Sequence, residues 1–433
     1  MPTVETLILG AGLAGLSTKW FLHSESAILD KGDRPGGLAI TYEESGYRFD
    51  ITGHWLHMRD DGVKESFGSL LDMNSVIRKS QIFTHERLIP YPFQSNLQLL
   101  PEDVKIRCVM DAVEAHVRRE KGEPEPTSFG DFVLYHFGEG IAHEFMFPYN
   151  KKLWGVEPNE ISHDWTQRFV PVPNLRQIVE GAFTDKHLKD GYNATFSYPP
   201  QGGIERFSAA IASKLDGIHL NTEVVRIHPT ERWVETASGE RWNYNFLVNT
   251  FPLKAFVQLL VNAPTSVRTA GDKLRSTSLD YLDLGLKGEA LRGLHWVYLP
   301  QKHLPAYRIG CFSNACPGMA PEGCSSLYVE LSNAVKWSLD DALNQTLDAL
   351  SAIGPDNVSR EDVEVCRRRH VDFAYVIYDH AYKKARSTVF EYLSGQKISS
   401  IGRYGKWVYA SMEDALIDGR ETAARLMEEF HGE

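Results

Sequence analysis

The amino-acid sequence predicts an α/β fold with three parts: a Rossmann-like nucleotide-binding domain, an inserted helical domain and a mixed, mostly antiparallel β-sheet domain. Three observations predict it. A glycine-rich turn follows a short apolar strand at residues 7–9, residues 98–190 are rich in long side chains without strand-like alternation, and residues 275–380 contain several runs of alternating apolar and polar residues. Helices and half-buried strands differ in these periodicities.

The bulk composition limits the possible functions. The chain has 433 residues, more than one average domain, and its formal net charge of −11 argues against nucleic-acid and anionic-membrane partners, which require a positive field. No apolar run approaches the length of a membrane span, which is about 20 residues. The five cysteines include no C-x-x-C pair. We therefore expect a soluble, cytoplasmic protein without a zinc site or a disulfide framework.

The amino-terminal segment "VETLILGAGLAGLSTKWFLHSESAILD" is typical of a strand, a tight turn, a helix and a second strand. Gly10, Gly12 and Gly15 fill the G-x-G-x-x-G positions, and Asp30 ends the second strand. The first glycine allows the turn, the second lets backbone amides approach a pyrophosphate, and the third packs helix on strand, while the acid binds a ribose hydroxyl. The pattern predicts a dinucleotide site; the alternative is a glycine-rich turn between core elements.

Two further stretches indicate that the dinucleotide is FAD. The run "DRPGG" at residues 33–37 resembles the R-x-G-G segment of FAD-dependent oxidoreductases of the amine-oxidase and mutase kind. Near the end of the chain, residues 402–409 look like a strand that leads into an amphipathic closing helix, whose amino-terminal amides can point at the flavin. The FAD contacts expected from these patterns and from the resemblance are Gly10, Gly12, Gly15, Asp30, Gly36, Gly37, Leu38, Gly53, His54, Val225, Gly402, Met412, Glu413 and Ala415.

The order of these patterns suggests an FAD-binding domain assembled from separate segments. We assign residues 1–80, 195–262 and 385–433 to it, residues 98–190 to a helical substrate or lid domain, and residues 81–97 and 263–384 to the sheet domain. Residues 218–250 alternate like a β-meander, and the last run, "FLVNT", is expected to return the chain to the nucleotide-binding sheet.

Five ordered stretches resemble the UDP-galactopyranose mutase family, its eukaryotic-type branch in particular. They are "LIPYPFQSNLQLLP", "FMFPYNKKLWGVEPNEISHDW", "YPPQGGIERFSAAIA", "LHWVYLPQKHLPAYRIGCFSN" and "GRYGKWVYASMEDA", and the similarity runs from about residue 4 to 427. The resemblance implies an isomerase that interconverts the pyranose and furanose forms of UDP-galactose, or of a related nucleotide sugar. It also implies that reduced FAD is the active form and that flavin N5 bonds to the sugar without net redox change.

The resemblance also implies roles for particular residues. Arg308 and Arg403 would hold the diphosphate, although either arginine alone is also explained by a salt bridge. The hydroxyls of Tyr409 and Tyr375 would touch the diphosphate, and the alignment at Tyr375 fits Tyr378 or Tyr382 as well. The remaining walls of a UDP-hexose site would be Tyr91, Phe93, Gln94, Asn96, Tyr149, Asn150, Trp154, Trp296 and Tyr298.

The stretch "YRFDITGHWLHMRDD" holds His54 and His57 three residues apart. A metal pair would need more ligands than lie nearby, and a core histidine is a second interpretation. The resemblance places Gly53 and His54 on a loop beside the flavin ring, where the histidine backbone contacts N5. The sequence departs from the family after this loop, at "WLHMRDD", and Arg168 is offset by one residue from the family's lid arginine.

Two other functions remain as alternatives. A flavin amine oxidase or protoporphyrinogen oxidase would share the fold and both FAD motifs, but it would not need Arg308, Arg403 or the "YPFQSN" wall. A non-catalytic FAD-bearing regulator would not need so many polar and aromatic cleft residues. The sequence leaves open the hexose, the reductant of the flavin and the oligomeric state.

Overall fold

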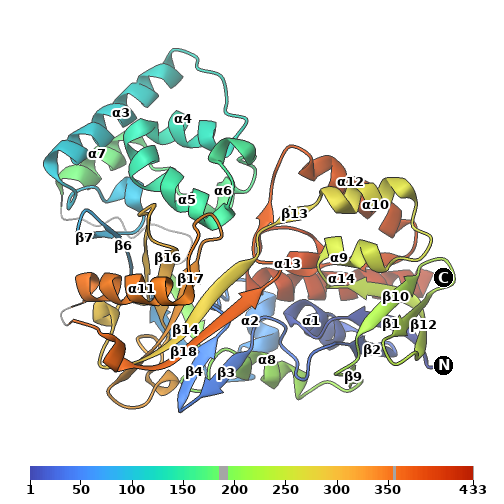
Figure 1. The fold of residues 1–433 in the computed structure, drawn as a ribbon. Coiled ribbons are helices and arrows are strands. Elements are labelled where there is room, and N and C mark those ends of the chain that lie inside the picture. The colour runs from blue at the N-terminus through green and yellow to red at the C-terminus, as the bar shows by residue number, and fades with distance from the viewer. Residues whose placement is uncertain (185–193, 355–356, 433) are drawn as a thin grey trace.

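A computed structural model describes residues 1–184, 194–354 and 357–432. It contains a mostly parallel sheet flanked by helices, a mixed sheet beside it, and a group of helices at one end of the molecule (Figure 1). The predicted fold class is confirmed at this level. The division into three domains with the boundaries given above stays a prediction.

The mostly parallel sheet is built around β1, whose apolar residues pair in parallel with β2 on one side and β12 on the other. The sheet order is β10-β11-β12-β1-β2-β9, and β20 also pairs in parallel with β12. The expected meander and return strand are therefore present. The bounds are β1 Thr3–Leu9, β2 Ser26–Leu29, β9 Ile218–His219, β10 Val224–His228, β11 Trp233–Thr236, β12 Arg241–Asn249 and β20 Ile398–Ser400.

The first helix and the closing helix pack on each other beside this sheet (Figure 1). They are α1 (Leu13–Phe21) and α14 (Met412–Gly432), and the Ser17 hydroxyl donates to the Leu416 carbonyl over 2.6 Å. A methyl group on Gly419 would lie 2.5 Å from Ser17 Cβ, so glycine is required at this close crossing. The contact holds the amino-terminal end of α14 near the turn that precedes α1.

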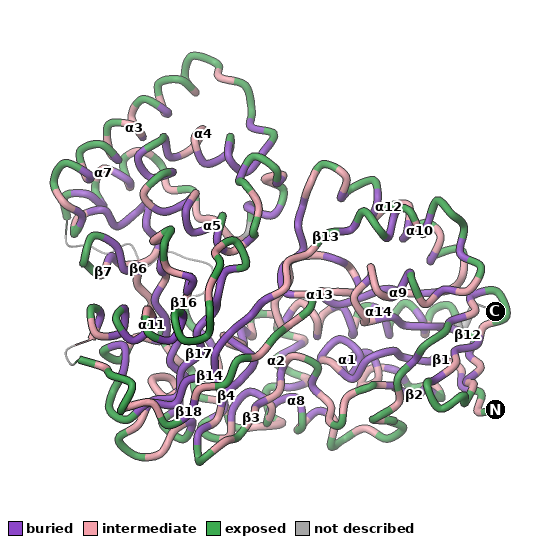
Figure 2. Tube along the Cα trace, viewed as in Figure 1, coloured by how far each residue is buried: buried purple, intermediate pink, exposed green. Residues whose placement is uncertain are grey.

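The second sheet is mostly antiparallel, as the alternating runs predict. Its order is β18-β14-β17-β16-β15-β6-β7, and only the β15–β6 pair within it is parallel among the described strands. Figure 2 shows that the middle strands are buried, and α11 (Leu339–Ile353) contributes to the same core. The bounds are β6 Ser80–Thr84, β7 Arg87–Pro90, β14 Leu279–Lys287, β15 Trp296–Tyr298, β16 Ala306–Cys311, β17 Cys324–Leu331 and β18 Val363–Val371.

The helical part begins at α3 and is joined to the rest by a continuous core. Ser128 starts α4 with a capping box, in which its hydroxyl accepts from the Asp131 amide over 3.0 Å. One cluster of buried side chains runs from Leu7 of the parallel sheet to Phe129 and Phe137 of this part. The bounds are α3 Glu102–Glu120, α4 Phe129–Ile141, a π-helical turn Ala142–Met146, α5 Phe147–Trp154, α6 Thr166–Phe169 and α7 Leu175–Phe183.

Shorter elements connect these parts. They are β3 Thr41–Glu44, β4 Tyr47–Asp50, α2 Asp61–Phe67, β5 Asn74–Ile77, β8 Thr195–Tyr198, α8 Glu205–Ala212, α9 Leu253–Leu259, α10 Thr265–Lys273, β13 Arg275–Ser276, β19 Val376–Ile377, α12 Tyr382–Ser394 and α13 Gly402–Gly405, with 3-10 turns at Phe93–Ser95, Pro158–Glu160, Leu291–Gly293, Pro317–Met319 and Arg360–Asp362. Among the described residues, none of the helices combines the length and the apolar composition that a membrane span requires.

The prediction of a strand at residues 402–409 is wrong. The strand is β20, which ends at Ser400, and Gly402 then adopts a φ of +74° and begins the short helix α13. The Asp418 carboxylate of α14 accepts from the Gly402 amide over 3.0 Å and stabilises this turn. Alternating aromatic residues in this stretch resemble a strand pattern, but the glycine backbone turns the chain toward the cavity instead.

Candidate functional site

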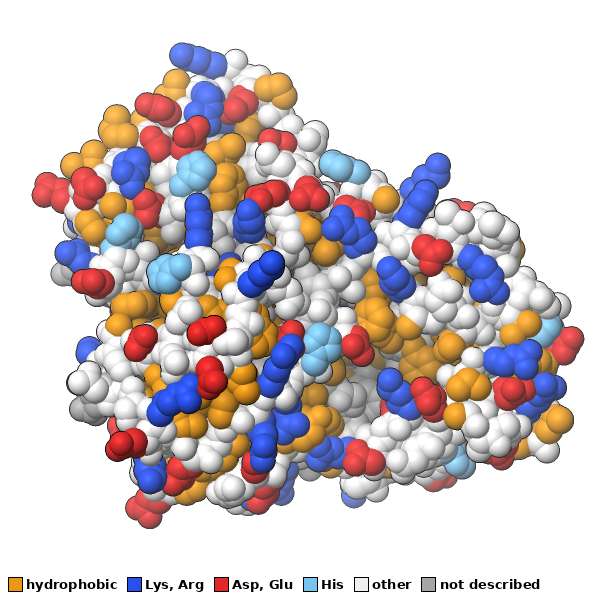
Figure 3. Space-filling view, in the orientation of Figure 1, with side chains coloured by type: hydrophobic (Ala, Val, Ile, Leu, Met, Phe, Trp, Pro, Cys, Tyr) orange, Lys and Arg blue, Asp and Glu red, His pale blue; other side chains and the backbone are white. Residues whose placement is uncertain are grey.

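A cavity of about 1100 Å³ runs between the mostly parallel sheet and the mixed sheet. Charged side chains surround the central hollow on the face shown in Figure 3. Most of the predicted site residues line the cavity. They are Gly10, Gly12, Asp30, Gly36, Gly37, Leu38, Gly53, His54, Tyr91, Trp296, Tyr298, Arg308, Tyr375, Gly402, Arg403, Tyr409, Met412 and Ala415.

One end of the cavity is lined by close backbone approaches. Gly37 has a φ of +63°, and a methyl group there would lie 3.1 Å from Gly12 Cα. Gly12 is the N-cap of α1 and makes no side-chain cap bond, so the first amides of the helix are available to an anion. Asp30 accepts from the Ala11 amide over 2.6 Å and holds the turn in place. This end fits the pyrophosphate of a dinucleotide such as FAD.

Three predicted cofactor residues do not line the cavity. Gly15 packs α1 on the turn as expected, since a methyl group there would lie 2.0 Å from the Gly10 carbonyl oxygen. Val225 is 37% exposed, and its neighbour Val224 lines the cavity instead, because side chains alternate along β10. Glu413 is buried and accepts from the Asp60 amide over 2.8 Å. Glu413 therefore fixes the loop that follows the two histidines.

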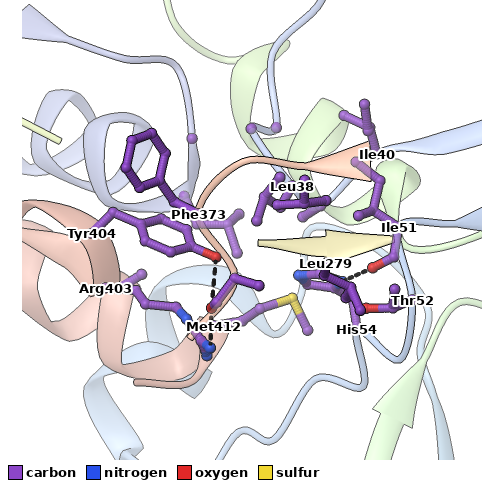
Figure 4. A pocket seen from close by; sticks show the side chains of 18 of the residues that line it. Leu38, Ile40, Ile51, Thr52, His54, Leu279, Phe373, Arg403, Tyr404 and Met412 are labelled. Carbon is purple, nitrogen blue, oxygen red and sulfur yellow. Dashed lines mark hydrogen bonds between the residues drawn. The ribbon is translucent and has the colours of Figure 1, made fainter. Parts of the chain in front are cut away.

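His54 also lines the cavity and lies among apolar side chains that include Leu38, Ile51 and Leu279 (Figure 4). Its Nδ1 atom makes a short contact with the Ile51 carbonyl. Burial lowers the pKa of His54 to about 4. The hydrogen bond with the Ile51 carbonyl raises this pKa, whereas the charges of Arg403 and Arg308 lower it further. His54 is therefore a neutral imidazole at neutral pH.

The loop around His54 is tightly packed. A methyl group on Gly53 would lie 2.6 Å from the Tyr328 hydroxyl, and Trp55 stacks on Trp296 with ring centroids 6.0 Å apart. His57 also lines the cavity, and its Nδ1 atom lies 2.8 Å from the Thr195 carbonyl oxygen. No group of three potential metal ligands occurs in the part of the chain that the structure describes.

Arg308 extends from β16 and is paired with a buried carboxylate. Glu330 lies opposite it on β17 and is fully buried. The guanidinium donates through Nε to Oε2 over 2.8 Å and through Nη2 to Oε1 over 2.5 Å. Burial alone would lower the pKa of Arg308, but the Glu330 carboxylate raises it well above the usual value. Arg308 is thus a fixed hydrogen-bond donor whose charge is already balanced.

Arg403 differs from Arg308 because its bonds go to neutral groups. Its Nη1 donates to the Ala410 carbonyl over 2.8 Å and its Nη2 to the Ala374 carbonyl over 2.9 Å. Its Nε is buried without a hydrogen-bond partner among the described residues. The rings of Tyr404 and Tyr409 lie 5.6 and 4.8 Å from the guanidinium carbon (Figure 4 shows Tyr404). The cavity therefore contains a cation whose charge a bound anion can balance.

The three candidate tyrosines have different surroundings. The Tyr375 hydroxyl accepts from Arg308 Nη2 over 3.4 Å, and Tyr375 lines the cavity with Tyr409. The Tyr378 hydroxyl accepts from the Tyr409 amide over 2.5 Å, and the Tyr382 hydroxyl donates to the Trp407 carbonyl over 2.7 Å. The placement favours Tyr375 over the other two as a cavity residue.

Six of the residues predicted to form the walls of a UDP-hexose site do not line the cavity. Tyr91 and Tyr298 line the cavity and contact each other, with ring centroids 5.1 Å apart. The six residues that do not line the cavity are buried and make their contacts within the protein. Gln94 donates to the Pro171 carbonyl, Asn96 to the Pro92 carbonyl and Asn150 to the Met146 carbonyl, while Phe93 stacks on Phe145, Tyr149 meets Tyr298 edge-on and Trp154 packs on Tyr375. Their predicted contact with a ligand therefore finds no support in this arrangement.

Sequence reasoning missed several residues that line the cavity. The Arg78 guanidinium lies 5.0 Å from the centre of the Tyr91 ring, and Trp55, Phe373 and Tyr404 complete the walls. Arg78 stands in no quoted motif, so only the three-dimensional structure could place it here. The Arg168 side chain, which the sequence offsets by one residue from the family's lid arginine, lies outside the described residues.

Comparisons with known proteins agree with this fold. The family described as "Flavin containing amine oxidoreductase" matches residues 13–427. A probable UDP-galactopyranose mutase of Klebsiella pneumoniae is 24% identical over 59% of this chain and 62% of its own length. Coproporphyrinogen III oxidase of Staphylococcus aureus (strain NCTC 8325 / PS 47) is 23% identical over 51% of this chain and 52% of its own. These matches span between half and two thirds of the curated relatives.

Solved structures resemble the whole chain. A crystal structure of reduced UDP-galactopyranose mutase superposes with a TM-score of 0.91 at 26% identity, over 99% of this chain and 94% of the other. A putative protoporphyrinogen oxidase from Exiguobacterium sp. 255-15 superposes with a TM-score of 0.74 at 16% identity, over 99% of both chains. The second likeness shows the fold alone.

Proposed function

Since the chain belongs to the family of flavin-containing amine oxidoreductases, we propose that it is a flavin-dependent isomerase that interconverts the pyranose and furanose forms of a UDP-hexose. UDP-galactose is the first candidate substrate. The observation that carries the proposal is Arg403, a buried guanidinium in the cavity wall whose hydrogen bonds go to neutral carbonyls. The TM-score of 0.91 with a reduced UDP-galactopyranose mutase supports the same assignment.

The two arginines would act differently on a nucleotide sugar. Arg403 would pair with the diphosphate through charge, both while the sugar is attached and after UDP separates from it. Arg308, held by Glu330, would donate a hydrogen bond in a fixed direction. Tyr375 lies beside both, with its hydroxyl 3.4 Å from Arg308 Nη2. These groups would keep UDP in place until it rejoins the sugar.

FAD fits the opposite end of the cavity, where Gly12, Gly37 and the start of α1 leave room for a pyrophosphate. Bound FAD in its reduced form would supply the nucleophile of the reaction. His54 would lie beside the ring as a neutral group, since burial lowers its pKa to about 4. Trp55 and Trp296 would exclude water from the sugar, because their stacked rings close the adjacent wall.

An amine-oxidase or protoporphyrinogen-oxidase-like reaction is the alternative that the family allows. An amine substrate brings no anion to an uncompensated guanidinium, so Arg403 favours a nucleotide sugar over an amine. The carboxylates of a porphyrinogen would also pair with Arg403, and binding of UDP distinguishes the two substrates. Titration of UDP into the FAD-loaded protein tests the proposal by calorimetry. We expect binding that Arg403→Ala weakens at least about tenfold, or about 1.4 kcal/mol, and that Arg403→Lys weakens less. Equal affinity in Arg403→Ala and wild type would contradict the assignment.

A further inference from the structure

Lys152 of α5 is a buried lysine whose hydrogen bonds go to neutral groups. It is 4% exposed, whereas its neighbour Lys151 has 51% of its side chain exposed. The Lys152 Nζ donates to three backbone carbonyls, those of Leu299 over 2.7 Å, Gln301 over 3.0 Å and Ala306 over 2.6 Å. All three ammonium protons are thereby bonded. Burying an ammonium among neutral groups is costly, so its presence here needs an explanation.

The three carbonyls belong to the hairpin that joins β15 to β16. Leu299 follows the end of β15, and Ala306 begins β16. The helix α5 lies beside β16 (Figure 1). The backbone carbonyl of Lys152 also accepts from the hydroxyl of Ser332, the residue after β17, over 2.7 Å. Lys152 therefore connects α5 to the ends of three neighbouring strands.

These strand ends direct two side chains into the cavity. Tyr298 lies opposite Arg308 across the β15–β16 pair, and both residues line the cavity. The β16–β17 register shifts between Ala306 and Arg308, so the strand is irregular immediately before the arginine. Such an irregularity changes the direction of the side chains beside it. Because the Ala306 carbonyl lies at this place and is bonded to Lys152, the direction of Arg308 depends on Lys152.

Packing alone does not account for the ammonium. A methionine has nearly the same length and would fill the space without burying a charge. The ammonium adds three directed bonds, which bring the Leu299, Gln301 and Ala306 carbonyls to one point. We propose that Lys152 is a positioning residue, which fixes the ends of β15 and β16 and so holds Tyr298 and Arg308 in the orientation that binds a nucleotide diphosphate. The ligand in this inference rests on the proposed function.

The strength of this anchor depends on the protonation of Lys152. An ammonium donates three hydrogen bonds and a neutral amine donates two, so one carbonyl loses its donor when the proton leaves. Burial lowers the pKa of Lys152 to about 7, and the anchor therefore weakens as pH rises through this value. The groups of the surrounding elements are Thr277, Ser278, Tyr307 and Asn333, which line a small pocket with Lys152, and the exposed Lys151, Glu157, Lys302 and His303.

Calorimetric titration of UDP into the FAD-loaded protein at about pH 6 and about pH 8.5, on either side of the Lys152 pKa of about 7, tests the proposal. At the lower pH, Lys152→Met should weaken UDP binding at least about tenfold without loss of bound FAD. The ratio of the wild-type affinity to the Lys152→Met affinity should fall at least about threefold at the higher pH, because wild-type Lys152 has then lost its proton. Protonation of UDP itself cancels in this ratio. Lys151→Met is the matched control, since Lys151 lies on the same helix but is exposed, and it should bind UDP as wild type does.

Hydrogen–deuterium exchange tests the anchor without a ligand. At the lower pH, the amides of residues 299–307 should exchange at least about tenfold faster in Lys152→Met than in wild type or Lys151→Met. Circular dichroism shows whether each variant is folded before it is compared. Lys152→Gln, which keeps two donors, takes the place of Lys152→Met in both measurements if the methionine variant does not fold, and it should change both in the same direction.

The outcomes separate this inference from the proposed function. UDP affinities that are equal in wild type and the Lys152 variant would overturn the inference, and so would equal exchange rates. An affinity ratio that stays constant between the two pH values would show a purely structural role and would overturn it too. If wild type itself binds no UDP, the proposed function fails, and the exchange rates alone decide whether Lys152 fixes the hairpin.

Discussion

Replacing Arg308 by methionine is expected to destabilise the protein, because Glu330 would become a buried carboxylate without a cation. Glu330 is fully buried and accepts two bonds of 2.8 and 2.5 Å from the guanidinium. Removing one partner of a buried ion pair costs about 3–5 kcal/mol. Glu330→Gln should cost less, about 1–3 kcal/mol, because Arg308 keeps 20% of its side chain exposed and stays near Tyr375.

The double variant Arg308→Met/Glu330→Gln separates this effect from lost packing. Because it removes both charges, its loss of unfolding free energy should be smaller than the sum of the two single losses by at least about 2 kcal/mol. Urea denaturation followed by tryptophan fluorescence and by circular dichroism measures these differences. Strictly additive losses, or an Arg308→Met variant as stable as wild type, would show that the Arg308–Glu330 pair does not compensate the buried carboxylate.

Two further predictions concern His54 and Gly37, two of the residues that are predicted to contact the cofactor. The pKa of His54 is about 4, below its ordinary 6.5, so the unfolded chain binds the proton first and stability is lost as pH falls from about 6.5 toward 4. Between pH 7 and pH 5, the unfolding free energy of His54→Gln should therefore fall by about 2 kcal/mol less than that of wild type. Parallel pH profiles of the two proteins would show that the burial of neutral His54 does not cause this loss of stability. Gly37→Ala should lower the FAD retained on purification, since the methyl group would lie 3.1 Å from Gly12 Cα. Gly239→Ala, with a similar positive φ of +84° and open space around it, should retain FAD as wild type does.

Much of the fold was predictable because it depends on local patterns. The glycine spacing, the acid after β2 and the alternating runs of the mixed sheet each reflect a periodicity that one segment carries by itself. The segment at residues 402–409 was not predictable in this way. Its aromatic alternation is compatible with a strand, and the turn at Gly402 depends on Asp418 of α14, sixteen residues further along the chain.

The site was predictable where a motif names a residue that faces the cavity, as with Arg308 and Arg403. The site was less predictable where the packing of a strand decides which of its side chains face the cavity. Val225 and Val224 differ by one position on β10, and only the paired strand shows which side chain points inward. The partner Glu330 lies 22 residues from Arg308 in sequence and is brought opposite it by the β16–β17 register. No spacing rule connects the two.

Turnover of a nucleotide sugar is the most direct test of the proposed function. The FAD-loaded protein is reduced with dithionite without oxygen, UDP-galactofuranose is added, and UDP-galactopyranose is followed by chromatography. We expect conversion by the reduced protein, no conversion by the oxidised protein, and at least tenfold slower conversion by Arg403→Ala, which corresponds to about 1.4 kcal/mol of barrier. Conversion that is equally fast in Arg403→Ala, or no conversion together with no effect of UDP on the flavin spectrum, would contradict the proposed function.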